Sequence, residues 1–465
     1  MENNHFNVRS YRAFGDGKTK DTAAIQQAID ECSGSGGGVV LIPSGTYLSG
    51  TIWLKDNVEL RLERGAEIKA SPDLADYNSD DAFLQNWNCP EEEVSGAHLI
   101  IALECRNAAI TGLGVINGNN DAYFDTSELK GRYWNIKTRR PAQMVFFCEC
   151  ENVSIENVSL IDPTYWSLYL YGCDDVRVRG LRIHNSFAAR NGDGIDIDCC
   201  RNVTVSDCII HSGDDCLTIR GDKNRLRLPR KEIDKDATRN INCADWTNKP
   251  EIAKCSENIC VSNCVLSSSC CAIRIGVGDG EIKNCTLNNI VISNSRFGIN
   301  LISKFSNYGI CGTTISNIRF SNFIINACMP FTIMNGNGSQ AEISNIFLND
   351  ISVTGAHCSY ICGEPDMKIR NVLFKNINFT LRCGKNNIAD ENDKSLTQIE
   401  RDVRRPAAFY CRNVTGLAFE NVVLDWQERS NFRHDIILDK TMADIRELRS
   451  NGSQYGITKS ICQLT

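Results

Sequence analysis

Three features that would place the chain in a familiar class are missing from its sequence. No apolar run approaches the 18 or more residues of a membrane span, so we expect no membrane segment. Positive charge is not in excess, because 50 Lys and Arg against 57 Asp and Glu leave a net charge of −7. Nucleic-acid binding draws on clustered positive charge, so we expect no nucleic-acid partner. Residues 1–16 contain no apolar stretch of the kind found in a secretory signal.

Cysteine, by contrast, is frequent, with 24 residues in a chain of 465. The sequence has no two matching C-x₂-C motifs, so it does not indicate a zinc site. A chain of this length also does not need disulfides to fold. Several cysteines open one short pattern: Cys105-Arg-Asn-Ala, Cys150-Glu-Asn-Val, Cys173-Asp-Asp-Val, Cys200-Arg-Asn-Val and Cys411-Arg-Asn-Val. Cysteines at a fixed place in a repeat behave as small interior hydrophobes. We therefore predict stacked, reduced thiols and a cytoplasmic location, or secretion if the N-terminus has been trimmed.

The same pattern recurs without cysteine at Asn317, Asn345 and Asn371, with spacings of 345 − 317 = 28 and 371 − 345 = 26 residues. A period in the twenties is typical of a solenoid. Each period holds short strands with alternating apolar residues, such as Val176-Arg-Val-Arg, and the L-x-x-L-x-L frame of leucine-rich repeats is missing. We predict an all-β, right-handed parallel β-helix of about ten coils that forms a single domain over residues 1–465.

The N-terminal segment and three insertions depart from the repeat. We expect residues 1–50 to form a cap. Within it, residues 20–33 place Ala24, Ile25, Ala28, Ile29 and Cys32 on one face of a helix that follows a possible N-cap at Asp21. Such a helix would cover the open end of the solenoid. The insertions, at about 118–142, 221–256 and 384–405, are polar and too long for turns, and long insertions often gather on the binding face.

Two acidic motifs lie one coil apart. The first is Asn191-Gly-Asp193-Gly and the second is Ser212-Gly-Asp214-Asp215-Cys216, with 214 − 193 = 21 residues between them. Parallel strands stack about 4.8 Å apart, so the carboxylates should lie on neighbouring rungs of one face. Neighbouring like charges keep one acid protonated while others stay ionised, which acid-assisted glycoside cleavage requires. The alternative is that these residues only occupy turns of the solenoid.

The two motifs resemble those of glycoside hydrolase family 28, the polygalacturonase and rhamnogalacturonase family of pectin-degrading enzymes. The resemblance covers most of the chain and includes Phe14-Gly-Asp-Gly, Gly112-Leu-Gly-Val-Ile-Asn-Gly and Arg140-Pro141. It implies that the chain folds as a right-handed parallel β-helix and that the enzyme inverts the anomeric centre of its substrate. It also implies that Asp214 is the general acid, that Asp193 and Asp215 position and deprotonate the attacking water, and that Asn191 contributes to substrate binding. We predict neither a cofactor nor a bound metal.

Two motifs of the polygalacturonases are missing. Their Gly-His-Gly should fall just before Ile275, where the chain reads Ser269-Cys-Cys-Ala-Ile-Arg, and their Arg-Ile-Lys should follow Gly298, where it reads Ile299-Asn-Leu-Ile. The rhamnogalacturonase branch also lacks the histidine and has a Cys-Ala step like Cys271-Ala272. Other cations could replace the lost pair, since a bidentate arginine suits a uronate carboxylate. The candidates for substrate binding are Arg220, Arg274 and Lys304.

We therefore predict an inverting glycoside hydrolase whose substrate is an oligosaccharide or small glycoside containing uronic acid or rhamnose. An inverting pair of carboxylates is expected to stand about 6.5–9.5 Å apart. The insertions at 118–142 and 221–256 flank the acidic coils and could close a groove into a pocket, so we expect exo action. A β-helix polysaccharide lyase and a non-catalytic glycan-binding solenoid are the alternatives. The first would need a calcium-binding carboxylate cluster, and the second would not need all three aspartates.

Overall fold

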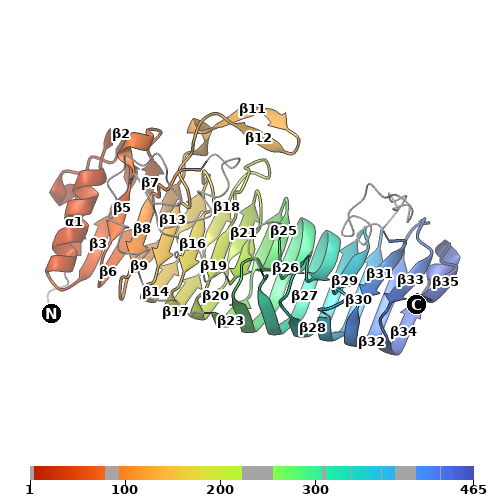
Figure 1. Cartoon of the computed structure of the whole chain (residues 1–465). Helices are drawn as coiled ribbons and strands as arrows, with labels where there is room; N and C mark the ends of the chain where they lie inside the picture. The colour runs from red at the N-terminus through yellow and green to blue at the C-terminus, as the bar shows by residue number, and fades with distance from the viewer. Residues whose placement is uncertain are drawn as a thin grey trace. The chain divides into compact units, whose positions relative to one another are not determined.

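The structure is a computed structural model of the chain, and it describes residues 5–78, 94–221, 255–305, 311–336, 338–367, 369–382, 405–429 and 431–464. The chain divides into two compact units, Met1–Leu217 with Lys223–Cys255, and Thr218–Asp222 with Ser256–Thr465. Parallel strands dominate both units (Figure 1). The single domain over 1–465 stays a prediction. Among the described residues, no helix combines the length and apolar character needed to cross a membrane.

In the first unit, the strands stack in three parallel rows, and each turn of the chain adds one strand to a row. The first row is β1 (His5–Asn7), β3 (Gly38–Ile42), β6 (Val58–Leu62), β9 (Ala109–Gly112), β14 (Glu151–Glu156), β17 (Asp174–Arg179) and β20 (Arg201–Ser206). The second is β2 (Asp16–Lys20), β4 (Gly45–Ser49), β7 (Ala66–Ala70), β10 (Val115–Asn117), β15 (Ser159–Ile161), β18 (Arg182–His184) and β21 (Ile209–Ser212). The third is β5 (Ile52–Leu54), β8 (Ile100–Leu103), β13 (Val145–Cys148), β16 (Leu168–Tyr171) and β19 (Ile195–Asp198).

The second unit continues the same plan with longer strands. After β22 (Leu217–Arg220), which begins at the last residue of the first unit, come β23 (Ser256–Ser262), β24 (Val265–Ser268), β25 (Cys271–Gly276), β26 (Glu281–Ile302), β27 (Thr314–Met334), β28 (Ile343–Gly355), β29 (Ser359–Cys362), β30 (Ile369–Leu381), β31 (Ala407–Arg412), β32 (Val414–Trp426), β33 (His434–Asp439), β34 (Ala443–Ser450) and β35 (Lys459–Leu464). Its longest row runs β23, β26, β27, β28, β30, β32, β34. The predicted parallel β-helix is confirmed. The longest row of each unit holds seven strands, and the segment predicted as a cap over 1–50 contributes β1, β2, β3 and β4 as well as the helix.

The repeated asparagine has a physical reason in both units. Asn152 in β14 and Asn317 in β27 stand at bends where the backbone is left-handed, at φ of 55° and 54°. Asparagine tolerates this conformation better than most residues. Its side chain also bonds to the coil before: Asn152 Nδ2 donates to Asn107 Oδ1 at 2.7 Å, and Asn317 Nδ2 donates to Asn284 Oδ1 at 2.7 Å. The pattern is therefore the signature of one bend repeated coil after coil.

The cysteines of the repeat are interior residues, as predicted. Cys105, Cys150, Cys173 and Cys200 are buried, and the pairing of β14 with β17 and of β17 with β20 sets the last three in register. Every cysteine in the described ranges is a free thiol. Burial raises the pKa of Cys173 well above its ordinary value. Thiols of this kind stay protonated and pack as small hydrophobes.

The predicted capping helix is α1 (Thr22–Gly34), and it packs on β1, β3 and β5. Its buried face is formed by Ile25, Ala28, Ile29 and Cys32, while Ala24 is only half-buried. Asp21 occupies the N-cap position, but its carboxylate accepts hydrogen bonds from the N–H groups of Phe14 (2.7 Å) and Gly15 (3.0 Å) instead of capping the helix. Short 3₁₀ helices occur at Val8–Tyr11, Leu74–Asp76, Asn120–Ala122 and Gly452–Tyr455.

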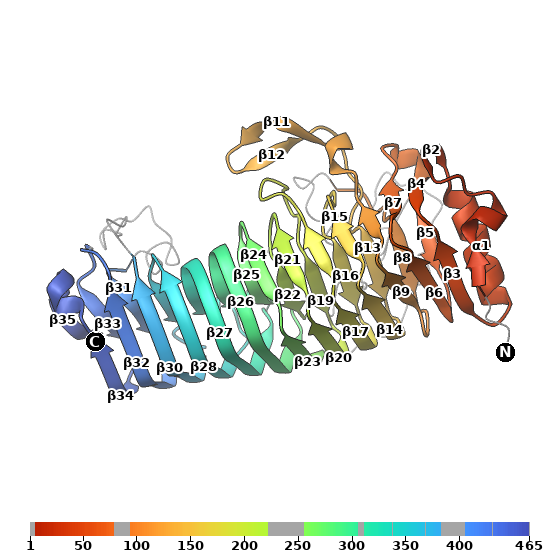
Figure 2. The same cartoon turned by 180° about the vertical axis from the view of Figure 1, so that it is seen from behind.

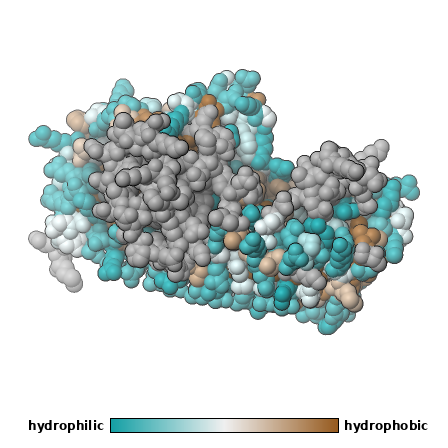
Figure 3. Space-filling view, viewed as in Figure 1, coloured by the Kyte–Doolittle hydropathy of each residue, from teal (hydrophilic) through white to brown (hydrophobic). Residues whose placement is uncertain are grey.

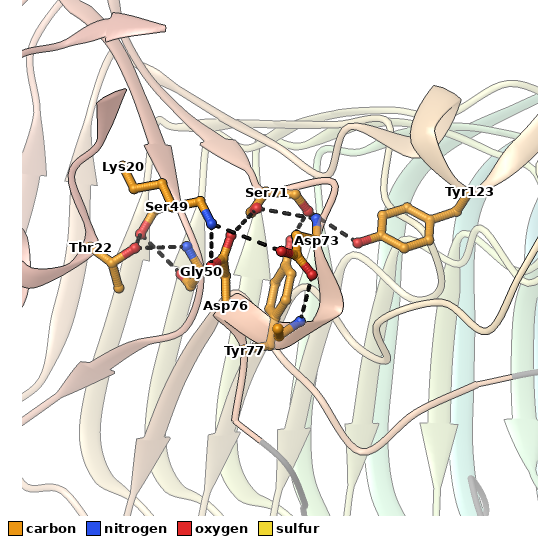
Figure 4. A network of polar contacts seen from close by, with 10 residues as sticks. Lys20, Thr22, Ser49, Gly50, Ser71, Asp73, Asp76, Tyr77 and Tyr123 are labelled. Atoms are coloured by element: carbon orange, nitrogen blue, oxygen red, sulfur yellow. Dashed lines mark hydrogen bonds and ion pairs between the residues drawn. The ribbon is translucent and has the colours of Figure 1, made fainter. Parts of the chain in front are cut away.

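A polar network joins this cap to the following coils (Figure 4). Lys20 Nζ lies 2.7 Å from Asp76 Oδ1, and the Ser71 hydroxyl donates to the same carboxylate. The Ser71 carbonyl oxygen accepts from the hydroxyls of Tyr77 at 2.6 Å and Tyr123 at 3.1 Å. Burial raises the pKa of the Tyr123 phenol to about 12, so this donor keeps its proton. The network therefore fixes Tyr123, which directly precedes β11 (Phe124–Lys130) in the first insertion.

The insertion predicted at 118–142 forms a hairpin of β11 (Phe124–Lys130) and β12 (Tyr133–Ile136). It stands away from the three rows of the first unit (Figures 1 and 2). The insertions predicted at 221–256 and 384–405 fall almost entirely outside the described residues. On the face drawn in Figure 3, the described surface is mainly hydrophilic, with single apolar side chains between the polar ones.

Candidate active site

The three predicted acids come together in the first unit. The N–H of Gly194 donates to the carbonyl oxygen of Asp215 at 2.8 Å, and this bond sets Asp193 opposite Asp215 on the next coil. One carboxylate oxygen from each of Asp193, Asp214 and Asp215 lies within 4.8 Å of the other two. Asp193 and Asp215 are buried, with 6% and 5% of their surface exposed, while Asp214 is half-buried. The carboxylates therefore form one compact acidic cluster.

The register explains how close these acids come. Asp193 and Asp215 stand on adjacent rungs, and rungs are about 4.8 Å apart, so one oxygen of each lies within 4.8 Å of the other. The separation of about 6.5–9.5 Å expected for the carboxyl groups of an inverting pair stays a prediction.

Two glycines make this close approach possible. The N–H of Gly213 donates to the carbonyl oxygen of Gly192 at 3.1 Å, which joins the turn before Asp214 to the turn before Asp193. A Cβ atom at Gly213 would lie 2.2 Å from the Ala189 carbonyl oxygen and 2.5 Å from that of Ser186. No side chain fits there. The glycine of Ser-Gly-Asp-Asp is thus a steric requirement of the site.

A buried polar pair holds the backbone of Asp193. The Ser167 hydroxyl donates to the carbonyl oxygen of Asp193 at 2.7 Å. Asn185 Nδ2 donates to the carbonyl oxygen of Gly192 at 2.8 Å and to Ser167 Oγ at 3.1 Å. Both side chains are fully buried. The sequence analysis did not predict this pair. A Ser and an Asn at inward positions of an apolar repeat nevertheless indicate that a buried backbone group needs a hydrogen-bond partner.

Arg140 fixes the loop that carries Asn191. This arginine is fully buried and donates to the carbonyl oxygens of Thr164 (2.5 Å) and Arg190 (2.7 Å) and to Asn191 Oδ1 (2.8 Å). Its guanidinium lies over the ring of Tyr165, 5.1 Å from the centroid. Three acceptors in fixed directions suit the planar guanidinium. Asn191 is therefore tied to Arg140, and its contact with a sugar stays a prediction.

The hairpin brings a further side chain to the acids. The hydroxyl of Tyr133 donates to Asp214 Oδ2 at 3.5 Å. Arg132, exposed in the turn of the hairpin, donates to the Tyr133 hydroxyl, and its guanidinium lies 4.5 Å from the centroid of the Tyr133 ring. The sequence predicted the insertion but not these two residues, because no local pattern distinguishes them from other polar residues of a loop.

The other predicted substrate-binding residues belong to the second unit. Arg220 is buried, and its carbonyl oxygen accepts from the Ser256 hydroxyl at 2.5 Å. Arg274 is 9% exposed, donates to Cys271 Sγ at 3.4 Å and lies 5.1 Å from the centroid of the Phe305 ring. Lys304 is half-buried and donates to the carbonyl oxygen of Gly338 at 3.4 Å. Their roles in sugar binding stay predictions.

The acidic cluster supplies what hydrolysis of a glycoside needs, which is a proton donor and a proton acceptor beside one bond. Three carboxylate oxygens within 4.8 Å could also hold a cation, although acidic groups often cluster without one. Calcium takes six to eight oxygen ligands, more than one oxygen from each of these three residues provides.

Comparison with known proteins identifies the class. The chain matches the family Glycosyl hydrolases family 28 over residues 32–370, well over half of its length. The protein therefore belongs to glycoside hydrolase family 28 and is a glycoside hydrolase.

Individual relatives agree with this assignment. The chain is 26% identical to a probable polygalacturonase of Arabidopsis thaliana, over 76% of this chain and 74% of that protein. It is 27% identical to an exo-poly-alpha-D-galacturonosidase of Dickeya chrysanthemi, over 45% of this chain and 41% of that protein. The crystal structure of a hyperthermoactive exopolygalacturonase from Thermotoga maritima superposes with a TM-score of 0.67 at 21% identity, covering 91% of this chain and 92% of that one. The right-handed β-helix is thereby confirmed.

Proposed function

We propose that the protein is an inverting, exo-acting hydrolase of pectin-derived oligosaccharides that contain uronic acid or rhamnose. The observation that carries the proposal is the cluster of Asp193, Asp214 and Asp215 within 4.8 Å. Asp214 is the least buried of the three, so it is best suited to meet the glycosidic oxygen of an incoming sugar. It serves as the general acid and gives its proton to the leaving oxygen as the glycosidic bond breaks.

Asp193 and Asp215 hold the attacking water. Two oxygens up to 4.8 Å apart can both bond to one water molecule, since each such hydrogen bond is about 2.8 Å long. One carboxylate orients the water and the other takes its proton as the new bond to the anomeric carbon forms. The proton lost by Asp214 and the proton gained by this pair then exchange with solvent. The short spacing is in this way compatible with a single displacement and inversion.

Two observations support the substrate class and the exo mode. The relatives named above are called a polygalacturonase, an exo-poly-alpha-D-galacturonosidase and an exopolygalacturonase, so pectic substrates and attack at a chain end both occur among similar proteins. In this chain the β11–β12 hairpin reaches Asp214, and a wall on one side of the acids favours a chain end over an internal segment.

The experiment that tests this function is a time course on pectic substrates. Purified protein is incubated with galacturonate oligomers, rhamnogalacturonate oligomers and a pectic polymer, and the products are separated by chromatography. We expect monosaccharide from the first time point and a slow fall in polymer viscosity. Rapid viscosity loss with long fragments would contradict exo action, and no product from any pectic oligomer would overturn the substrate class.

A reducing compartment such as the cytoplasm fits the free and mostly buried thiols of the described residues. The redox state of the cysteines is measured by alkylating unfolded protein taken directly from its native host and analysing it by mass spectrometry. We expect every cysteine to be alkylated without prior reduction. Cysteines that react only after reduction would indicate disulfides and an oxidising compartment.

A further inference from the structure

The tip of the β11–β12 hairpin has a defined geometry. Lys130 pairs with Tyr133, so the turn consists of only two residues, Gly131 and Arg132. Gly131 has φ of 69°, a left-handed conformation that glycine adopts at little cost and that two-residue hairpin turns require. The turn therefore sets Arg132 and Tyr133 side by side at the end of the hairpin.

The hairpin is anchored on both sides. The N–H of Trp134 donates to the carbonyl oxygen of Ala188 at 2.9 Å, within the loop that leads to Asp193. The N–H of Lys137 donates to the carbonyl oxygen of Tyr123 at 2.8 Å, and the Tyr123 hydroxyl is fixed on Ser71 (Figure 4). A recognition element that is already ordered loses less entropy when it binds. The position of the tip beside Asp214 is thus built into the fold.

The tip presents a positive charge next to the acid. The Arg132 guanidinium contacts the hydroxyl and the ring of Tyr133, and the same hydroxyl donates to Asp214 at 3.5 Å. The cation therefore lies one hydrogen bond beyond the tyrosine, within reach of a sugar whose glycosidic oxygen meets Asp214. Stacking on the ring keeps the guanidinium plane in one orientation.

An acidic sugar needs such a cation here. Three carboxylates within 4.8 Å, in a protein of net charge −7, repel a substrate that carries its own carboxylate. The Arg-Ile-Lys segment that the resemblance predicts for this task is replaced by Ile299-Asn-Leu-Ile in this chain. A guanidinium binds a carboxylate through two parallel hydrogen bonds, which gives both affinity and orientation.

We propose that Arg132 and Tyr133 form a specificity site that binds the carboxylate of a uronate next to the scissile bond. This inference rests on the proposed function, and it names the residues that select an acidic over a neutral sugar at that site. Arg132 binds the sugar carboxylate, while Tyr133 holds the guanidinium in place and lines the same position beside Asp214.

The test compares an acidic with a neutral substrate. The probes are digalacturonate and its methyl ester, and the variants are Arg132→Gln and Tyr133→Phe. Lys137→Gln is the matched control, because it removes one positive charge from the same insertion, where Lys137 Nζ donates to the Asp121 carbonyl oxygen at 2.9 Å. A charged hydrogen-bonded contact is worth about 1.5–3 kcal/mol, or roughly a 10- to 150-fold change in an equilibrium constant.

For Arg132→Gln we expect KM on digalacturonate to rise about 10- to 100-fold, with kcat within a few-fold of the unmodified enzyme and KM on the methyl ester unchanged. Tyr133→Phe should raise KM less. Lys137→Gln should leave KM and kcat unchanged on both substrates. An equal effect of Arg132→Gln on both substrates, or no effect on either, would overturn the specificity site.

The two proposals fail in different ways. If the unmodified enzyme hydrolyses neither substrate, the proposed function is contradicted. Binding of galacturonate to Asp193→Asn protein, measured by calorimetry with and without Arg132→Gln, then still decides the role of Arg132. Equal affinity in these two proteins would overturn the specificity site on its own, and a loss of binding confined to the Arg132→Gln protein would support it.

Discussion

Asp193 and Asp215 face each other on neighbouring coils, since the hydrogen bond from the Gly194 N–H to the Asp215 carbonyl oxygen sets them in register at 2.8 Å. This relationship determines the chemistry of the site. A β-helix can bring two residues 22 positions apart to the spacing of one rung, because 215 − 193 = 22 residues complete one turn. Asp214, the neighbour of one of them, then completes a cluster in which a donor and an acceptor serve the same bond.

The acidic cluster predicts a loss of activity without a loss of fold. Asp214→Asn and Asp193→Asn should each lower kcat by at least 10²–10⁴-fold, because they remove the general acid or a carboxylate that activates water. Melting temperatures should stay close to that of the unmodified protein. Asp175→Asn is the matched control, since Asp175 stands at a bend of β17 with φ of 56°, a conformation that asparagine also adopts. Near-normal rates in both active-site variants would show that the assigned roles are wrong.

Arg140 predicts an effect of positioning. Arg140→Lys keeps the charge but cannot serve the Thr164 and Arg190 carbonyl oxygens and Asn191 together. Buried acceptors that lose their donor cost about 1–3 kcal/mol each, so the melting temperature should fall. We expect kcat to fall about tenfold or more, since the loop that carries Asn191 leads directly to Asp193 and is displaced when Asn191 loses this donor. The exposed neighbour Arg139, changed to lysine in the same way, should leave kcat unaltered. A rise in KM at constant kcat would instead indicate direct substrate binding.

Gly213 predicts a steric effect at the join of the two acidic turns. Gly213→Ala would place a Cβ 2.2 Å from the Ala189 carbonyl oxygen, so the turns must separate. We expect a destabilisation of about 1–3 kcal/mol and loss of most activity, measured by chemical unfolding and turnover. Gly34→Ala is the control, because nothing lies within 4 Å of the added atom. Equal stability of the two variants would mean that the turns adjust freely.

Asp162 predicts a dependence of stability on pH. Burial first, and then the charge of Asp121, raise the pKa of this carboxyl in the folded protein, while His184 acts in the opposite direction. A raised folded pKa means that its contribution to stability is fully present below the unfolded value of about 3.9 and is lost as pH rises through the folded value. Asp162→Asn should therefore raise the melting temperature more at pH 7 than at pH 3. An effect of equal size at both pH values would show that the charge is not responsible.

Much of the fold could be predicted because each coil repeats the same local solution. An asparagine in a left-handed bend, a buried cysteine and short alternating strands are visible in any one period, and repetition multiplies the signal. The acids could be predicted for a similar reason, since Asp193 and the pair at 214–215 lie in short motifs one coil apart. The spacing of their carboxylates could not, because it depends on register.

The remaining parts of the site depend on contacts that no local pattern reveals. Tyr133 meets Asp214 across 81 residues, and Arg140 meets Asn191 across 51. From its sequence, the hairpin is recognisable only as a polar insertion. The two-residue turn and the anchors on Ala188 and Ser71 determine which of its residues reaches the acids. Long-range contacts of single residues lack the repetition that made the coils predictable.

The stereochemistry of the first product tests the roles of Asp193, Asp214 and Asp215 most directly. Proton NMR of the reducing-end signals during hydrolysis of digalacturonate, recorded before mutarotation, identifies the anomer that forms first. Because Asp193 and Asp215 can share one water while Asp214 protonates the leaving oxygen, we expect the anomer of inverted configuration to appear first. The retained anomer appearing first would mean that a carboxylate of this closely spaced cluster attacks the sugar itself, and would contradict direct displacement by water.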